Sequence, residues 1–139
     1  MAETLNEEIR RALHELRAAE KDQALFYRSL AAQAEAAGDE ALAERLNGLH
    51  ADEQHHLSRL TARLLELGEP LADLRSRPAP SATLEGWEST ARERERAEID
   101  RYRALLEQPL DEVTAARIRE ILRVEELQER ELGGKWTTA

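Results

Sequence analysis

Four segments of the chain carry apolar residues at spacings of three and four, and near the middle of each segment a glutamate interrupts the apolar stripe. Apolar residues at these spacings share one face of an α-helix, so each segment predicts an amphipathic helix. The interrupting acids lie on the apolar face itself: Glu20, Glu53, Glu95 and Glu125. The chain is therefore expected to fold as four helices that pack around a core containing carboxylates.

Helix-capping and helix-breaking residues bound these four segments. Thr4 and Glu7 have the spacing of a capping box at the start of the first segment, while Gly38 can end it and Asp39 can cap the second. The composition agrees with an all-α fold, because Ala, Leu, Glu and Arg dominate it and aromatic residues are only 4%. The predicted helices span about residues 4–37, 40–67, 84–107 and 112–132.

The connection over residues 68–82 is much longer than the other two. An extended chain covers ~3.3 Å per residue, so this segment can reach roughly 45 Å. A helix of 26 residues is about 39 Å long. The connection can therefore cross the whole bundle and start the third helix parallel to the second. The alternative is a loose loop in an up-down-up-down bundle, and length alone does not decide between the two.

The two halves of the chain repeat each other. Glu20 precedes Tyr27 by seven residues, as Glu95 precedes Tyr102. The second helices match step for step, with Leu46, Leu49, Glu53, His56 and Leu60 corresponding to Ile118, Ile121, Glu125, Gln128 and Leu132. In each half the two acids also lie at similar distances from the turn between the helices. The sequence therefore predicts a layer of at least four carboxylates in the middle of the core.

Such a layer needs counter-charges, because an unpaired buried carboxylate costs several kcal/mol or becomes neutral. No basic residue lies on the four stripes, so divalent cations are the predicted counter-charge. His56, three residues after Glu53, lies on the same helix face and favours a transition metal. In the fourth helix, Glu126 and Glu129 offer a shifted register, which would place them on the inward face and leave Glu125 facing water.

These residues resemble the ferritin-like superfamily, and within it the rubrerythrin-type diiron domain, over nearly the whole chain. The resemblance implies that residues 1–139 form one antiparallel four-helix bundle with a long crossover between helices two and three. It also implies two bound iron ions, with manganese as an alternative. The implied metal ligands are Glu20, Glu53, His56, Glu95, Glu98 and Glu125.

Two positions make the expected site unsymmetrical. Gln128 stands where ferritin-like diiron proteins generally have a second histidine. Glu98 matches the extra glutamate of rubrerythrin-type sites, which is expected to serve the iron that lacks a nitrogen ligand, and its counterpart in the first helix is Gln23. The alternative for Glu98 is a solvated acid within the charged run 92–98. The asymmetry favours the rubrerythrin type over bacterioferritin.

The remaining histidines and aromatic residues are expected to be structural. The hydroxyls of Tyr27 and Tyr102 are expected to bond to ligand carboxylates in the core. The residues expected to lie off the ligand face or to serve in packing are His14, His50, His55, Trp87 and Trp136.

The resemblance implies a diiron oxidoreductase that reacts with O2 or H2O2, as a peroxidase or a ferroxidase. The chain has no cysteine and therefore lacks the four-cysteine iron module of rubrerythrins proper, so a peroxidase would need a separate electron donor. Two alternatives are open: iron storage within an oligomer or larger shell, and a metal-free helical interaction module whose acids would be exposed. A homodimer or higher homo-oligomer is expected by analogy.

Charge and hydropathy limit the partners. A net charge of −9 disfavours nucleic acid and anionic membranes, since both are polyanions. No apolar run approaches the ~20 residues of a membrane span. The acidic N-terminus is unlike a signal peptide, so a cytoplasmic protein is expected.

Overall fold

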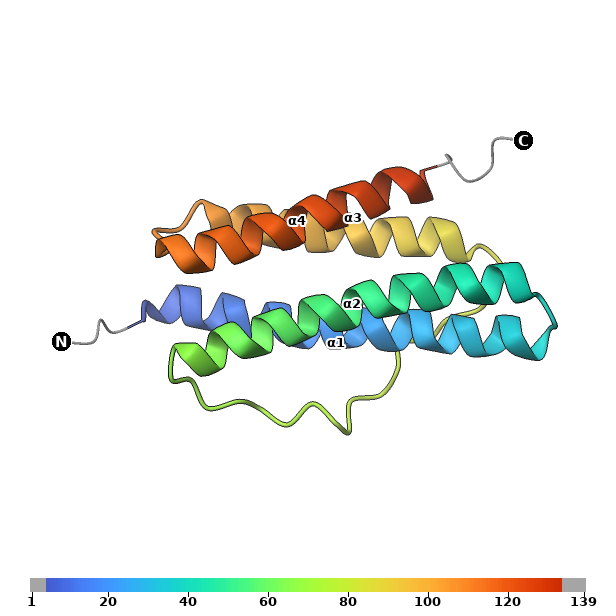
Figure 1. Cartoon of the computed structure of the whole chain (residues 1–139), viewed down its shortest axis with the longest axis horizontal. Coiled ribbons are helices and arrows are strands. Elements are labelled where there is room, and N and C mark those ends of the chain that lie inside the picture. The colour runs from blue at the N-terminus through green and yellow to red at the C-terminus, as the bar shows by residue number, and fades with distance from the viewer. Residues whose placement is uncertain (1–4, 134–139) are drawn as a thin grey trace.

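Four helices lie along a common long axis in the computed structural model, which describes residues 5–133 (Figure 1). They are α1 (Glu7–Ala36), α2 (Glu40–Glu66), α3 (Trp87–Leu106) and α4 (Glu112–Leu132). α1 and α2 form one antiparallel hairpin, and α3 and α4 form a second. Because the intervening segment returns along the bundle, α2 and α3 run in the same direction. The predicted all-α bundle with one long crossover is confirmed.

The helix ends agree with the predicted bounds within one residue at each C-terminus, but two of the starts differ. α1 begins at Glu7, because the side chain of Asn6 caps it by accepting from the backbone N–H of Glu8 at 2.8 Å. The expected cap Thr4 lies outside the described residues. α3 begins at Trp87 rather than at residue 84, because Gly86 has a φ of 68° and turns the chain into the helix.

Glycines end α1 and α2 as the sequence predicts. Gly38 and Gly68 have φ values of 75° and 76°, in the left-handed region that glycine adopts without steric cost. The backbone N–H of the residue after each glycine reaches back into the last helical turn, from Asp39 to Ala34 and from Glu69 to Leu64, at 3.0 Å in both cases. These bonds satisfy carbonyl groups that the helix ends would otherwise leave free.

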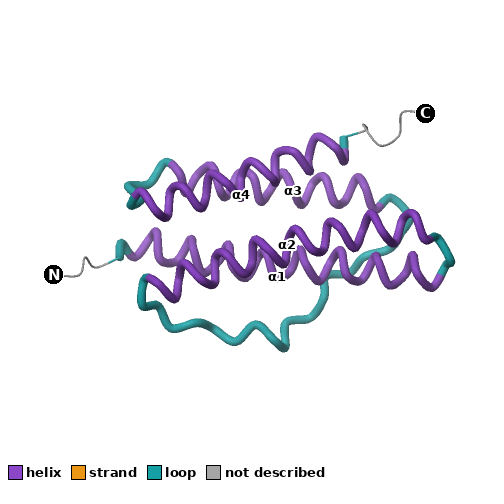
Figure 2. Tube along the Cα trace, viewed as in Figure 1, coloured by secondary structure: helices purple, strands orange, loops and turns teal. Residues whose placement is uncertain are grey.

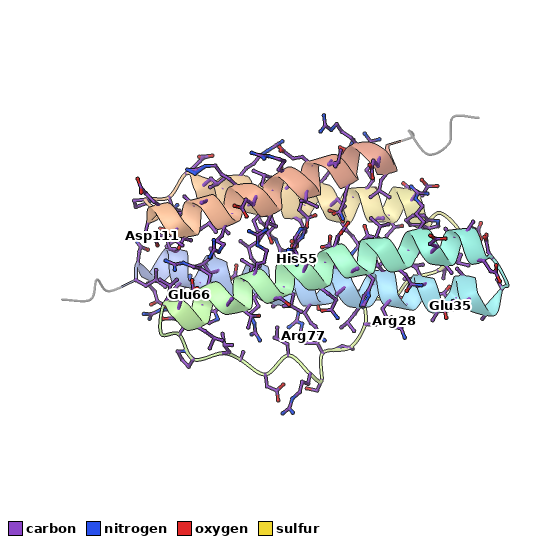
Figure 3. The ribbon with its side chains drawn as sticks, viewed as in Figure 1. Arg28, Glu35, His55, Glu66, Arg77 and Asp111 are labelled. Atoms are coloured by element: carbon purple, nitrogen blue, oxygen red, sulfur yellow. The ribbon has the colours of Figure 1, made fainter. Side chains whose placement is uncertain are left out.

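The crossover runs from the end of α2 back along the bundle to the start of α3 (Figure 2). Side-chain contacts hold it against α1, so the alternative of a loose loop is wrong. Arg77 points from the crossover toward α1, where its guanidinium forms two bonds to the carboxylate of Asp22 at 2.7 and 2.8 Å (Figure 3). Arg17 of α1 donates to the carbonyl of Ala72 at 3.0 Å. Gln33 donates to the carbonyl of Ala82 at 2.8 Å.

The core consists of two apolar clusters, one toward each end of the bundle. One cluster contains Leu30, Leu46 and the predicted packing residue Trp87, while the other contains Leu16 and Leu60. The predicted acids occupy the helix turns between the two clusters. Trp136 lies outside the described residues. Among residues 5–133, no helix is long and apolar enough to cross a membrane.

Candidate metal centre

All six predicted ligand positions lie inside the bundle. The exposed fraction is 0% for Glu20, Glu53, Glu95 and Glu125, 2% for His56 and 5% for Glu98. The shifted register of α4 is wrong, because Glu126 and Glu129 are half-buried at the surface and pair with arginines of α3. The burial of Glu20, Glu53, Glu95 and Glu125 also contradicts the metal-free interaction module, which required these acids to be exposed.

Three carboxylates from three helices lie close to the imidazole of His56. Its Nδ1 atom lies 2.9 Å from Oε1 of Glu125, 3.6 Å from Oε2 of Glu20 and 3.9 Å from Oε1 of Glu53. Ligand atoms of all four residues lie within 4.8 Å of one another, so this group could hold a metal ion.

Two tyrosines connect the hairpins by hydrogen bonds to the buried acid in the first helix of the opposite hairpin. The hydroxyl of Tyr27 in α1 donates to Oε1 of Glu95 in α3 at 2.9 Å. The hydroxyl of Tyr102 in α3 donates to Oε1 of Glu20 in α1 at 2.6 Å. Burial and the carboxylate it contacts raise the pKa of each tyrosine, so both hydroxyls remain protonated donors. The predicted role of these tyrosines as hydrogen-bond partners of the acids is confirmed.

Glu98 is buried within the centre, so the alternative of a solvated acid is wrong. Its carboxyl lies close enough to that of Glu20, which belongs to the His56 group, for the charge of Glu20 to raise its pKa. That Glu98 serves the position without a nitrogen ligand stays a prediction. A helical spacing of three places Glu98 on the face of Glu95 but does not specify which facing helix the long side chain reaches. Its helix-one counterpart Gln23 instead donates to Glu95 at 3.3 Å and accepts from Arg94.

Gln128 occupies the place on α4 that His56 occupies on α2. Its Nε2 donates to Oδ2 of Asp52 at 2.8 Å. Sequence reasoning missed Asp52 and Arg94, because both lie off the apolar stripes and contact glutamines more than 70 residues away. The other histidines lie outside the centre, as predicted: His14 contacts Glu69, His50 is half-buried and His55 is exposed.

The carboxylates have fewer donors than their burial requires. Among residues 5–133, no hydroxyl, amide or basic group donates to Oε2 of Glu20, Glu95, Glu98 and Glu125 or to either oxygen of Glu53. The carboxyl groups can hydrogen-bond one another only where one of a pair holds a proton. Divalent cations would satisfy the same oxygens in their ionised form, so the donor set fits hard or borderline metal ions.

A sequence model of the ferritin-like domain matches residues 10–136. This chain belongs to the ferritin-like family. The match includes every residue of the candidate centre and all but the first turn of α1. A search of curated proteins gave no match to the chain.

In this ferritin-like bundle, the pKa values of the buried acids shift in different directions. Burial raises the pKa of Glu53 and Glu125 well above the ordinary value, and the neighbouring carboxylates raise it further. Burial and the carboxylate of Glu20 raise the pKa of Glu98 to about 9. Burial acts in the same direction on Glu20, but the nearby imidazole of His56 and the hydroxyl of Tyr102 favour its charged form and lower the pKa of that carboxyl. Carboxyls of high pKa must release protons to bind a metal.

The metal-free ferritin-like bundle should become less stable as the pH rises. A carboxyl with a pKa of 4.5 in the unfolded chain and about 9 in the fold, such as Glu98, favours folding at low pH and opposes it as the pH rises between these values. With EDTA present, we expect an unfolding temperature at least about 5 °C higher at pH 5.5 than at pH 8.5, at about 4 °C per kcal/mol. The variant Glu98→Gln should show a smaller difference. A metal-free protein that is more stable at pH 8.5 would contradict this expectation.

Proposed function

We propose that the chain is a carboxylate-bridged diiron protein that reacts with O2 or H2O2, a rubrerythrin-like peroxidase or ferroxidase in iron or oxidative-stress handling. The observation that carries the proposal is the central place of Glu125. Its Oε1 lies 2.9 Å from Nδ1 of His56, and its carboxyl is also close enough to that of Glu95 for the two charges to shift each other's pKa. One buried carboxylate thus faces both halves of the centre, as a bridging ligand must.

Glu53 and Glu125 would be shared by two metal positions, and each of the other residues would serve one of them. Glu20 and His56 would complete one metal position, with Glu98 beside Glu20, and Glu95 would serve the other. Bound iron would supply the electrons and Lewis acidity for reducing O2 or H2O2. The protein fixes the ligands through the two tyrosine bonds and excludes bulk water, since the four glutamates of the centre have no exposed surface.

Iron binding and oxidation test this proposal. The protein is loaded with Fe(II) without air, bound iron is counted per chain, and the loaded protein is mixed with O2 or H2O2 in a stopped-flow instrument. We expect about two Fe(II) ions per chain. Oxidation at least about tenfold faster by H2O2 than by O2 supports the peroxidase, and the reverse order the ferroxidase. Accumulation of many Fe(III) ions per chain favours the storage alternative, and a protein that binds no Fe(II) refutes the proposal.

The proposal includes two kinds of partner. A peroxidase must be re-reduced after each turnover, and this chain has no cysteine with which to hold a thiolate-bound iron donor. We therefore propose a separate electron donor. We also propose a homodimer or higher homo-oligomer, which light scattering on the purified protein will establish through its mass.

A further inference from the structure

Gln128 has a buried amide oxygen that no donor satisfies. Its side chain is 3% exposed, and among residues 5–133 nothing donates a hydrogen bond to its Oε1. Its other amide atom, Nε2, is fixed at 2.8 Å from Oδ2 of Asp52. Only the NH2 group of an amide can donate to a carboxylate, so this contact determines which end of the amide is which.

The bond to Asp52 turns the amide oxygen away from the surface. Asp52 is exposed, whereas Oε1 of Gln128 is buried. Gln128 also lies one helical turn after Glu125, on the same face of α4. The internal repeat gives it the place of His56, which lies one turn after Glu53 and directs its Nδ1 toward Glu125. A neutral oxygen therefore stands on α4 where an imidazole nitrogen stands on α2.

We propose that Oε1 of Gln128 is a ligand of the second metal position, the one served by Glu95, and that Asp52 is a positioning residue that orients the amide. This inference rests on the proposed two-metal function. It makes the two positions chemically different, because one has an imidazole and the other has oxygen ligands only. Imidazole favours late transition metals, whereas carboxylate and amide oxygens favour harder ions. The two ions should therefore bind in two separate steps.

A surface cavity reaches the same pair of residues. It has a volume of about 460 Å3 and lies between α2 and α4, where Gly48, Leu49, Asp52, Gln128 and Leu132 line it. Glu53, Glu95 and Glu125 are not part of its lining. The amide of Gln128 therefore stands in the wall between this cavity and the carboxylates, and the second position is the one nearer to solvent.

Calorimetric titration with Co(II) tests the assignment. We expect the wild-type protein to bind two ions in two steps, the second at least about tenfold weaker than the first. Gln128→Leu removes the amide oxygen, so it should weaken the second step at least about tenfold and leave the first unchanged. Gln128→His supplies an imidazole and should strengthen the second step by at least about tenfold. Circular dichroism checks that each variant is folded.

Asp52 is tested by the same two-step measurement. Asp52→Ala should weaken the second step about tenfold without changing the first, and Asp52→Asn, whose side-chain oxygen can still accept from the amide, should restore most of it. A purely structural role for Asp52 would change neither step. The matched control is Gln54→Leu, the same replacement at an exposed position of α2, which should leave both steps unchanged.

Two outcomes overturn the inference. A second step that Gln128→Leu leaves at wild-type strength shows that the amide is not a ligand, and the proposed diiron function then stands without it. Loss of both steps in a folded Gln128→Leu protein shows that Gln128 does not serve the second metal position alone. Failure of the proposed function looks different, because the wild-type protein would then bind no Co(II) at all.

Discussion

Replacing Glu53 with leucine should lower bound iron from about two ions per chain to fewer than about 0.5. Glu53 has no exposed surface, and among residues 5–133 neither of its oxygens accepts a bond from a hydroxyl, amide or basic group. As a proposed bridging ligand it would contribute to both metal positions, so its removal should empty both. Iron is counted on protein loaded anaerobically and passed through a desalting column.

The same substitution should stabilise the metal-free protein. Burying a carboxyl without a full set of partners is unfavourable, and an apolar residue of similar volume removes that cost, with a gain of about 1–3 kcal/mol. The unfolding temperature with EDTA should therefore rise by about 4–12 °C. If Glu53 destabilises the metal-free fold but is needed to bind the metal, then metal binding rather than stability explains why a glutamate stands at this position.

Glu66→Leu is the matched control, because Glu66 lies on the same helix at the surface (Figure 3), where it pairs with Arg63 at 2.9 Å. It should keep its iron and change the stability by less than about 1 kcal/mol, as is typical of an exposed ion pair. If Glu53→Leu retains two iron ions, or if it destabilises the metal-free protein as much as an ordinary core substitution, the carboxylate layer is not a metal centre.

The fold and the buried layer could be predicted because they depend on local spacing. The periodicity of the apolar residues fixes one face of each helix, and the distances of Glu20 and Glu53 from Gly38 fix their common height. Both are properties of a regular helix and need no knowledge of the neighbours. For the same reason the repeat between the halves correctly predicted that Tyr27 and Tyr102 bond to acids.

The contacts between helices could not be predicted in the same way. The path of the crossover depends on Arg77 meeting Asp22, which lies 55 residues earlier in the chain, and length alone left that path open. The carboxyl of Glu98 reaches Glu20 because of the direction of a flexible side chain, which the helix face does not determine. Asp52 gave no signal at all, because an exposed acid in a chain with 35% charged residues is unremarkable until its partner Gln128 is placed beside it.

Metal ions should raise the unfolding temperature of the wild-type protein by at least about 10 °C. A ligand that binds only the folded state at 100 times its Kd stabilises it by about 2.7 kcal/mol, which corresponds to about 4 °C per kcal/mol in a chain of this size. The proposed ligands come from all four helices, so the unfolded chain cannot present them together. Thermal unfolding is followed by circular dichroism with EDTA or with excess Mn(II), which avoids oxidation during heating.

Adjacent histidines supply the control for this stabilisation. His56 is 2% exposed and its Nδ1 faces three carboxylates, whereas His55 is exposed on the surface of α2 (Figure 3). His56→Ala should remove at least about half of the metal-induced shift, because it deletes the nitrogen ligand of the tighter position. His55→Ala should keep the full shift. Equal shifts in both variants would mean that Mn(II) binds to acids on the surface, since only a buried centre distinguishes two histidines that are neighbours in the sequence.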